Sequence, residues 1–458
     1  MDTKIVKLSD VVSHKKEFII IDDNIEYKRC RVKLHRQGIV IRDIIKGSEI
    51  NTKKQQVCKT GQLLVAEIDA KVGGYGIVPE ELNGAIVSSH YFLFDVDLEK
   101  INLAYLEYYL KTDVFFNQIK PQGSTNYAAI RPRDVLNINI PMPLKEIQRD
   151  IIQKLNVAFD NIDSFSSKNE LNNENLIALR QSILQEAVQG RLVQQDPSDE
   201  PVSVLLERIK AEKKELVQKK KIKNEKNHEP ITDDIIPYVL PHGWEWARLG
   251  DIVALENGSI RRGPFGSAIR KDMFVPKAEN TYKVYEQGNA IRKSSSYGDY
   301  YISESKFNEL QSFEVKAGDI IISCAGTIGE TYLIPDDAPK GVINQALLKL
   351  RMNNKVIRND YFLYLFKSLT QLELNEAAKG SAMKNLVSID TLKNNVIFPI
   401  PPLKEQKRIV EKVNQIIEMC EELQNLVDKS KLDSQMLMQA ILQEAFESHD
   451  ESKFIILT

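Results

Sequence analysis

Ile183-Leu184-Gln185-Glu186-Ala187 returns near the end of the chain as Ile441-Leu442-Gln443-Glu444-Ala445. Other matches keep the same order in both halves: Gln37-Gly38 and Ile41-Arg42 with Gln287-Gly288 and Ile291-Arg292, Gly61 and Leu63 with Gly318 and Ile320, Val72-Gly73 with Ile328-Gly329, Asn102, Leu106, Gly123 and Ser124 with Asn359, Leu363, Gly380 and Ser381, and Pro143-Leu144-Lys145-Glu146 with Pro402-Leu403-Lys404-Glu405. Chance can produce one such match but not an ordered series. The chain is therefore an internal duplication.

Each copy begins with short β-branched runs and continues into helix. Phe18–Ile21, Leu63–Ile68 and Ile86–Phe94 are broken by glycine and polar residues, which is typical of strands in a mixed sheet. Helical stretches follow near Asn102–Ile119 and near Asn359–Ala378. We expect an α+β fold, a tandem repeat of two mixed α/β domains separated by two long helices that form an antiparallel coiled coil.

Prolines mark the start of each long helix. No proline lies between Pro143 and Pro197, and none follows Pro402. Proline is tolerated in the first turn of a helix and excluded from its interior. The predicted segments are a globular domain at 1–142, a helical spacer with a basic helix and linker at 143–240, a second globular domain at 241–401, and a C-terminal helical spacer at 402–458.

Both long helices carry apolar residues at alternating spacings of four and three. The seam positions are Ile151, Leu155, Ala158, Ile162, Phe165, Leu176, Leu179 and Ile183 in the first helix, and Ile409, Val413, Ile416, Cys420, Leu423, Val427, Leu437 and Ile441 in the second. Asn169, Asn172, Ser430 and Ser434 interrupt the two seams, where polar residues can fix register. The spacing predicts that the helices pack on each other. The alternative is that each is an amphipathic helix on its own domain's core.

The length of the seam predicts how far apart the two domains lie, and antiparallel packing predicts how they are related by symmetry. Ile151 to Ile183 spans roughly 48 Å at about 1.5 Å per residue, so the helices would hold the two domains about 50 Å apart. Antiparallel packing would relate the domains by a pseudo-two-fold axis. Duplex DNA is the common ligand for such an arrangement, because it has a two-fold symmetry of its own. Half-sites one helical turn apart on DNA lie roughly 34 Å apart.

Composition narrows the class of protein. Basic and acidic residues nearly cancel, 62 against 64, so any DNA-binding surface must be local. The four cysteines have no metal-ligand or CxxC spacing, which favours free thiols in a reducing compartment. Met1–Asp10 has no apolar signal core, and no run approaches the roughly 20 apolar residues of a membrane span. We expect a cytoplasmic protein without membrane contact.

A lysine-rich helix is predicted between the two copies. Val202–Lys226 looks helical, and lysines crowd its end at Lys210, Lys213, Lys214, Lys219, Lys220, Lys221, Lys223 and Lys226. Glutamates at 207, 212 and 215 are interspersed. The helix is thus either a solvated surface or a surface that attracts phosphates.

Several motifs resemble one family, the specificity subunits of Type I restriction–modification systems. The residues that carry the resemblance are Pro143–Glu146 and Pro402–Gln406, Gln185–Leu192, Asp196–Pro201 with Leu205–Ile209, Pro241–Trp246 with Arg248–Asp251, and Gly263–Ser267. The resemblance covers nearly the whole chain. The first copy departs from it by opening with Leu8-Ser9-Asp10 and lacking the Gly-Trp-x-Trp motif, so its outer strand is not defined by the sequence.

The resemblance implies a DNA-recognition role. Each domain would read one half of an asymmetric bipartite site in double-stranded DNA. The helices would set the unread gap and dock two modification subunits, which bind S-adenosylmethionine and methylate adenine. Motor-nuclease restriction subunits would add ATP- and Mg-dependent cleavage. This chain itself would bind no cofactor or metal.

The motifs of catalysis are missing from the sequence. Pro401-Pro402 lies between Ile400 and Leu403, unlike the Asn/Asp-Pro-Pro-aromatic motif of amine methyltransferases. No P-loop is present, and the six histidines lack metal-ligand spacing. We expect a non-catalytic subunit.

Candidate DNA contacts follow from chemistry, since Arg pairs with guanine, Asn and Gln with adenine, and Lys or Ser with phosphate. In the first domain they are Gln37, Arg42, Lys46, Ser124, Asn126, Tyr127 and Arg131. In the second they are Arg261, Arg262, Phe265, Ser267, Gln287, Arg292, Lys293, Lys379, Ser381 and Lys384. We expect Arg261, Arg262, Arg292 and Lys384 to share one concave face. For each residue taken singly, a solvated loop position is the alternative.

Other classes of protein remain as alternatives. A coiled-coil scaffold or adaptor with two protein-binding domains would show the same duplication. So would the specificity subunit of a related methylation-based defence system. A stand-alone nuclease or methyltransferase is disfavoured by the missing motifs.

Overall fold

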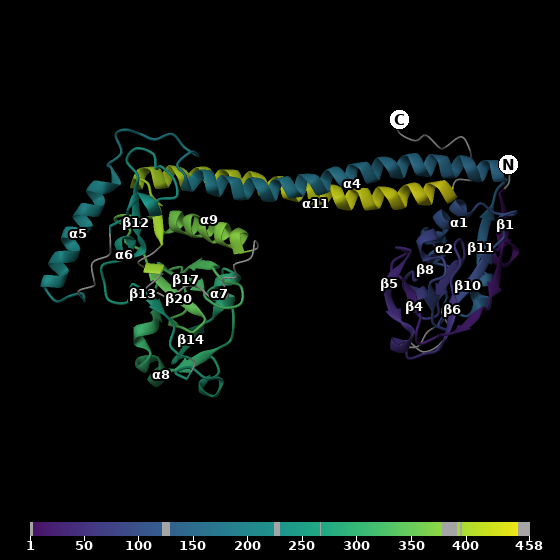
Figure 1. Ribbon diagram of the computed structural model, residues 1–458, viewed down its shortest axis with the longest axis horizontal. Coiled ribbons are helices and arrows are strands. Elements are labelled where there is room, and N and C mark those ends of the chain that lie inside the picture. The colour runs from purple at the N-terminus through teal and green to yellow at the C-terminus, as the bar shows by residue number, and fades with distance from the viewer. Residues whose placement is uncertain are drawn as a thin grey trace. The chain divides into compact units, whose positions relative to one another are not determined.

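The computed structural model describes residues 3–120, 129–223, 230–265, 267–377, 392–393 and 396–447, with the backbone alone at 370–377. It divides into two compact units, unit 1 with Met1–Asn172 and Leu426–Thr458 and unit 2 with Asn173–Asn425 (Figure 1). Each unit holds one globular domain and part of both long helices. Within the described ranges no helix is long and apolar enough to cross a membrane. The predicted α+β fold is confirmed.

Unit 1 contains a two-stranded, a four-stranded and a five-stranded sheet. In sheet order the strands are β1 (Lys4–Lys7) and β11 (Asn139–Met142); β2 (Val12–Lys15), β10 (Tyr91–Val96), β7 (Leu63–Ala66) and β8 (Tyr75–Ile77); and β3 (Phe18–Ile20), β6 (Lys54–Val57), β9 (Ile86–Val87), β4 (Glu26–Val32) and β5 (Ile39–Lys46). Its short helices are α1 (Leu103–Leu110), α2 (Asp113–Phe116) and α3 (Pro132–Leu136). β1 pairs antiparallel with β11, so the first domain has an outer strand although it lacks the motif.

Unit 2 contains a two-stranded sheet and two four-stranded sheets. In sheet order the strands are β12 (Glu245–Arg248) and β21 (Ile397–Ile400); β13 (Ile260–Arg262), β20 (Leu347–Arg351), β17 (Asp319–Ser323) and β18 (Thr331–Leu333); and β15 (Tyr301–Ser303), β14 (Thr281–Tyr285), β19 (Gly341–Ile343) and β16 (Glu314–Val315). Its helices besides the long pair are α5 (Val202–Gln218), α6 (Leu249–Ile252), α7 (Gln287–Ile291), α8 (Glu304–Glu309) and α9 (Asn359–Ala377).

The central four-stranded sheets of the two units are equivalent. β7 lies between β10 and β8 as β17 lies between β20 and β18. Gly61 and Gly318 precede these strands with the same φ of +81°, which favours glycine, and their N–H groups donate to Val78 and Ile334 carbonyls at 2.9 Å. This part of the predicted alignment is correct.

The match between Gln37-Gly38 and Gln287-Gly288 is wrong in local structure. Gln37 lies in the hairpin loop between β4 and β5, whereas Gln287 begins helix α7. Both follow a strand that pairs in parallel, β4 with β9 and β14 with β19. The two copies therefore use the same place in the topology for different structures.

A buried glutamine joins each long helix to its domain. Gln148 accepts from the Asn102 N–H at 2.8 Å and donates to the Pro143 carbonyl at 2.9 Å. Gln406 accepts from the Arg358 N–H at 2.7 Å and donates to the Pro401 carbonyl at 2.9 Å. These bonds make Arg358, not Asn359, the counterpart of Asn102, and Pro401, not Pro402, the counterpart of Pro143.

Tyrosines confirm that one-residue correction. Tyr105 and Tyr361 donate to the carbonyls of Pro141 and Pro399 at 3.1 and 3.2 Å. Tyr108 and Tyr364 donate to the side chains of Asn156 and Asn414. In the corrected alignment the two tyrosine pairs are also identities, so the bonds and these residues agree on the equivalence.

The long helices are α4 (Lys145–Val188) and α11 (Leu403–Glu447). Their ends pack on the domains. In unit 1, Leu155 near the start of α4 and Leu442, Ala445 and Phe446 at the end of α11 belong to the domain core. In unit 2, the core takes residues from the end of α4 and the start of α11: Ile183, Leu184, Ala187, Val188, Ile409, Val410 and Val413. At their ends, then, the helices behave as the predicted alternative, amphipathic helices on domain cores.

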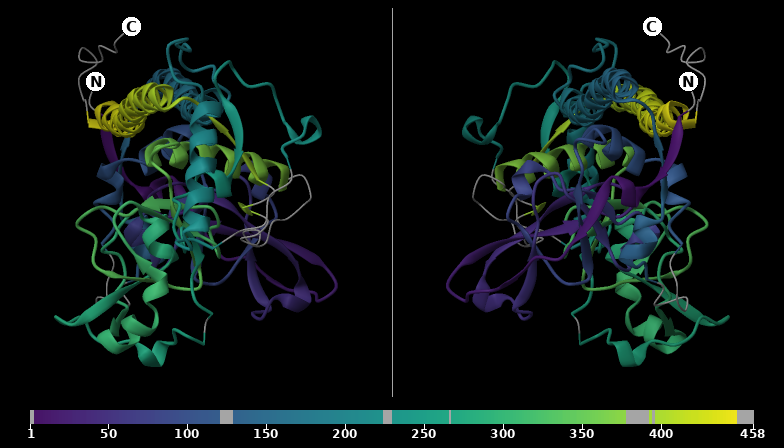
Figure 2. Two further views of the ribbon diagram at one scale, coloured as in Figure 1. Left: turned by 90° about the vertical axis from the view of Figure 1, so that its left-hand side faces the viewer. Right: turned by 90° about the vertical axis from the view of Figure 1, so that its right-hand side faces the viewer.

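Away from the domains the helices pack antiparallel on each other, side by side when viewed along their axes (Figure 2). Ile162, Leu176 and Cys420 are buried seam positions, at 7%, 8% and 1% exposure. In unit 1, Asn169 donates to the Ser430 hydroxyl at 2.9 Å, so a polar layer lies in the seam. Four predicted seam residues, Phe165, Leu179, Leu423 and Leu437, are instead half-exposed, because two helices cover a seam from only one side.

Candidate nucleic-acid interface

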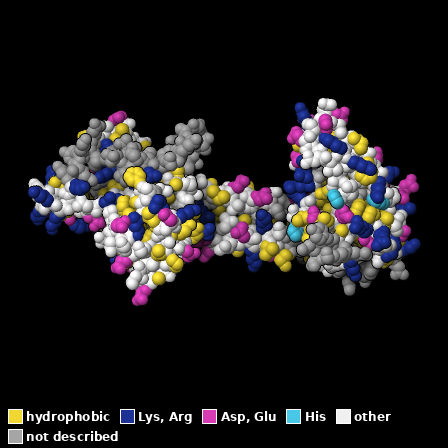
Figure 3. Space-filling model, turned by 90° about the horizontal axis from the view of Figure 1, so that it is seen from below, with side chains coloured by type: hydrophobic (Ala, Val, Ile, Leu, Met, Phe, Trp, Pro, Cys, Tyr) yellow, Lys and Arg dark blue, Asp and Glu magenta, His cyan; other side chains and the backbone are white. Residues whose placement is uncertain are grey.

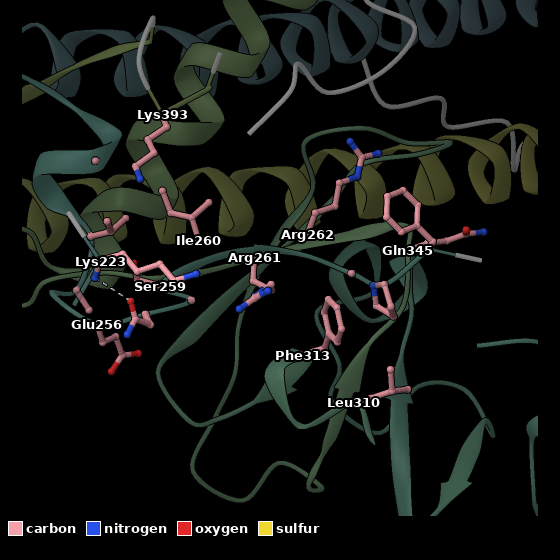
Figure 4. A pocket seen from close by; sticks show the side chains of 18 of the residues that line it. Lys223, Glu256, Ser259, Ile260, Arg261, Arg262, Leu310, Phe313, Gln345 and Lys393 are labelled. Carbon is pink, nitrogen blue, oxygen red and sulfur yellow. Dashed lines mark hydrogen bonds between the residues drawn. The ribbon is translucent and has the colours of Figure 1, made fainter. Parts of the chain in front are cut away.

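A cleft of about 1190 Å³ opens in unit 2 beside strand β13 (Figure 4). Its walls come from segments far apart in the sequence: the end of α5 with the residues that follow it, the loop after α6, β13 with its following loop, and the segment before β21. Arg261, Arg262, Phe265 and Ser267, all predicted contacts, line this cleft.

Backbone geometry ends β13 and exposes the loop that follows. A side chain at Gly263 would place its Cβ 1.8 Å from the Asn344 carbonyl oxygen, so only glycine fits there. Pro264 is buried and, lacking an N–H, cannot extend the ladder. Phe265 next to it is 89% exposed. The loop thus presents a large aromatic ring to solvent at the edge of the cleft.

Arg261 makes a cation–π contact inside the cleft. Its guanidinium carbon lies 5.5 Å from the centre of the Phe313 ring, and its Nε is buried with no acceptor among the described residues. Across the ladder lies Lys349, which donates to the Glu314 carbonyl at 2.7 Å and lies 3.6 Å from Asp319. Burial lowers the pKa of Lys349. A positioned Arg above an apolar floor suits bidentate recognition of guanine or phosphate.

The charged residues that line the cleft are predominantly basic. Five are cationic, namely Lys213, Lys223, Arg261, Arg262 and Lys393, and one is acidic. That acid, Glu256, has a carboxylate oxygen 3.5 Å from Arg351 Nε. The cleft is therefore a local positive site on a chain of nearly neutral charge.

The predicted contacts around α7 do not line this cleft. Gln287 has a buried Oε1 without a partner among the described residues. Arg292 lies over the Tyr297 ring at 4.8 Å, and Lys293 donates to Glu330 at 2.7 Å and to the Thr331 carbonyl at 2.6 Å. Arg292 does not line the cleft of Arg261 and Arg262, and the expectation that it shares a concave face with them stays a prediction.

In unit 1 the predicted cations are exposed, and two of them, Arg42 and Arg131, form ion pairs. Arg42 Nε lies 3.5 Å from Asp43, and Arg131 Nη1 lies 2.7 Å from Glu67. Gln37 and Lys46 are exposed at the two ends of β5, with Lys46 opposite Glu26. Exposed pairs of this kind are weak and remain open to exchange for a phosphate.

Six predicted contacts lie outside the described residues. They are Ser124, Asn126 and Tyr127 in the first domain and Lys379, Ser381 and Lys384 in the second.

Strand register identifies a basic residue that sequence reasoning missed. Lys15 on β2 lies opposite Leu93, as Arg261 on β13 lies opposite Lys349. Leu93 and Lys349 are themselves equivalent, because they pair with Leu64 and Ile321 in the equivalent strands β7 and β17. The Lys15-Lys16 dipeptide thus corresponds to Arg261-Arg262. The equivalence of Lys15 and Arg261 is visible only when the paired strands of the two units are aligned, because the residues around them are not identical.

The chain matches the family model described as Type I restriction modification DNA specificity domain, over residues 1–177 and 241–432. It is 30% and 32% identical to the EcoAI and EcoEI specificity subunits of Type I restriction enzymes from Escherichia coli, over 58% of this chain and 44% of each relative. Those matches span less than half of the relatives' length. The Escherichia coli EcoBI specificity subunit is 21% identical over 93% of this chain and 83% of its own.

Solved structures share the fold over nearly the whole chain. One is a chain from a structure on complex assembly and conformational transition of the type I R-M system, with a TM-score of 0.62, 20% identity, and 97% of both chains covered. Another is the HsdS subunit from Thermoanaerobacter tengcongensis, with a TM-score of 0.53, 20% identity, and 97% and 96% covered. Since the family model accounts for both copies of the duplication, the chain belongs to the Type I restriction–modification DNA specificity family.

Proposed function

We propose that this chain is the non-catalytic DNA-recognition subunit of a Type I restriction–modification complex, with each domain reading one half of an asymmetric bipartite site. The observation that carries the proposal is the positive cleft of unit 2, where Arg261, Arg262 and the exposed Phe265 gather beside a strand. Arg can read guanine in the major groove, and an exposed ring can contact a thymine methyl group or an unstacked base.

The duplication supports a site in two parts. Unit 1 has the same central sheet and, at the register of Arg261, the basic residue Lys15. Because the two domains differ in their loops and in these residues, they would read different bases, and the site would be asymmetric. The long helices between the domains would set the length of the unread gap.

The half-exposed seam residues support docking of two partner proteins. Phe165 and Leu437 in unit 1 are each 50% exposed, and Leu423 and Leu179 in unit 2 are 48% and 44% exposed. Residue 165 corresponds to 423, and 179 to 437, in the register that pairs Gln148 with Gln406. In unit 1 they line a groove of about 560 Å³ together with Ile162 and Leu426. Two equivalent apolar surfaces suit two copies of a modification subunit.

In this proposal the reactions take place on other subunits. S-adenosylmethionine would bind to the modification subunits, and ATP and Mg²⁺ to the restriction subunits. The complex would act on DNA in the cytoplasm, without a membrane.

Adenine methylation in a host genome tests the proposal. Co-expression of this chain with its modification subunit should place methyladenine at a two-part motif with a fixed gap, read by single-molecule sequencing. Exchange of residues 1–142 for those of a homologue should change one half of the motif and leave the other. A single contiguous motif, or no new methylation with a soluble complex, would refute the proposal and favour a protein scaffold.

A further inference from the structure

The lysine-rich helix α5 and the turn after it form a feature of unit 2 that the described part of unit 1 does not repeat. We call α5 with residues 219–223 the basic arm. Figure 3 shows Lys and Arg side chains gathered at the edge of unit 2 that carries α5. The sequence leaves open whether these lysines are a solvated surface or a phosphate-binding one, and the way the arm is anchored places some of them at the cleft.

One face of α5 is fixed to the domain. Val202, Leu206 and Ile209 belong to the main core of unit 2. Farther along, Glu212 accepts two bonds from Lys355 Nζ at 2.9 and 3.0 Å, and Lys213 Nζ lies 3.5 Å from the Gly250 carbonyl. The helix therefore has a defined position relative to the cleft.

The tip of the arm is held as well. Lys220 has a φ of +55°, and the N–H groups of Lys220 and Lys221 donate back to Val217 and Leu216 carbonyls at 3.0 and 2.9 Å, which ends the helix in a tight reversal. The Asn257 side chain then bridges the tip: it accepts from the Lys223 N–H at 3.3 Å and donates to the Lys221 carbonyl at 3.2 Å.

This anchoring places the tip at the cleft that contains Arg261 and Arg262. Lys213, Ile222 and Lys223 line this cleft together with β13 and Phe265, and Figure 4 shows Lys223 beside Ser259 and Glu256. Lys219, Lys220, Lys221 and Lys223 are all exposed. Lysine is a flexible point charge that binds phosphate without geometric selectivity, whereas Arg and aromatic side chains can read base edges.

We infer that the tip of the basic arm is a second DNA contact, which binds backbone phosphates beside the half-site of unit 2 and reads no bases. The inference rests on the proposed DNA-binding function. Under this inference, unit 2 binds its half-site in two ways, and unit 1 does not. The arm binds the phosphates of any duplex, and the cleft binds the bases of the half-site.

Salt dependence of binding tests the arm. The complex of the chain with its modification subunit is titrated onto a fluorescent duplex with the methylation motif and onto a scrambled duplex, over a range of salt concentrations. Each phosphate contact contributes about 0.9 to the slope of log K against log salt. Lys221→Gln with Lys223→Gln should lower the slope by about 1 to 2 on both duplexes and leave the methylation motif unchanged.

Two matched variants sharpen the test. Lys210→Gln with Lys214→Gln removes the same charge from exposed positions of α5 that do not line the cleft, and should leave the slope near that of the unaltered complex. Lys221→Arg with Lys223→Arg keeps the charge and should keep the slope.

Several outcomes would overturn the inference. A slope equal to that of the unaltered complex would show that the tip does not reach DNA. An unchanged slope with loss of the co-purifying modification subunit would make the arm a protein interface. An altered motif would make it a base-reading element. The failure of the unaltered complex to yield any bipartite motif would instead refute the proposed function.

Discussion

Gln148 in unit 1 and Gln406 in unit 2 share two hydrogen bonds: each accepts from a backbone N–H, at 2.8 and 2.7 Å, and each donates to a proline carbonyl at 2.9 Å. The equivalent central sheets of the two units, in contrast, differ in their polar pairs. Where unit 1 has Gln62 bonded to Asp95 at 2.6 Å, unit 2 has Asp319 bonded to Arg351 at 2.7 Å.

The difference shows which parts of the duplication are constrained. The junction of helix and domain keeps its bonds in both copies, since these bonds hold each domain on the paired helices. In the sheets, Gln62 and Asp319 are both buried, and each is matched by a different partner on the neighbouring strand, so the pair changes charge as a unit. This pattern is expected of a protein that carries two recognition domains of different specificity on one pair of helices.

The largest effect is expected from replacing the junction glutamines, which should lower the local stability of a unit. Gln406→Leu removes the partners of the Arg358 N–H and of the Val356 and Pro401 carbonyls in a fully buried site. Each unpaired buried group costs about 1–3 kcal/mol, so local stability of unit 2 should fall by about 3 kcal/mol or more. Hydrogen exchange of peptides from each unit measures the local stability of the two units separately, whereas a single melting temperature would not distinguish them.

Gln148→Leu should destabilise unit 1 alone, and by less, because Gln148 donates to one backbone carbonyl where Gln406 donates to two. The exposed Gln415→Leu and Gln153→Leu, on the same two helices, serve as controls and should change exchange little. If Gln148→Leu left unit 1 as protected as before while Gln406→Leu opened unit 2, the two junctions would not be equivalent.

A smaller effect is expected where the units differ in chemistry. Arg261→Ala should weaken binding of the motif duplex by about 1–3 kcal/mol and relax one half of the motif. Lys15→Ala, at the same register in unit 1, should weaken binding by less, because Lys binds as a point charge and lies 3.7 Å from Asp95. Anisotropy titrations and methylation mapping measure both.

Arg270→Ala is the matched control for the cleft. Arg270 is exposed, pairs with Asp272 at 3.2 Å, and does not line the cleft. Its removal should leave affinity and motif unchanged. Relaxation of the same half of the motif by Arg261→Ala and by Lys15→Ala would contradict the assignment of one half to each unit.

Much of this fold is predictable from short-range patterns in the sequence. Heptad spacing and the prolines before α4 and α11 indicate the long helices, because both depend on local backbone chemistry. The alignment of the copies fails by one residue at Asn102 and Pro143, because short runs of identity fit two registers there and only the long-range bonds to Gln148 and Gln406 decide between them.

The site is predictable only in part, for the same reason. Arg261, Arg262 and Phe265 are close in sequence, and the chemistry of their side chains identifies them. Lys213 and Lys223 reach the same cleft through the packing of Val202 and Ile209 and the Asn257 bridge, contacts that a lysine count does not reveal. Lys15 and Lys16 belong to no recurring motif in the sequence, and their equivalence to Arg261 and Arg262 follows only from the register of Lys15 opposite Leu93.

The smallest expected effect concerns the exposed seam, where the two units are most alike in apolar character. Phe165→Ser in unit 1 and Leu423→Ser in unit 2 each remove one half-exposed apolar side chain, which should weaken docking of one modification subunit by roughly 1–2 kcal/mol, about tenfold in Kd. Native mass spectrometry of a dilution series should show one subunit lost early from either variant and both from the double variant. Val157→Ser, at an exposed position of α4 outside the groove, should dissociate like the unaltered complex. Early loss of both subunits from a single variant would mean that the partners bind each other more than they bind the helices, and the two surfaces would then not act as separate sites.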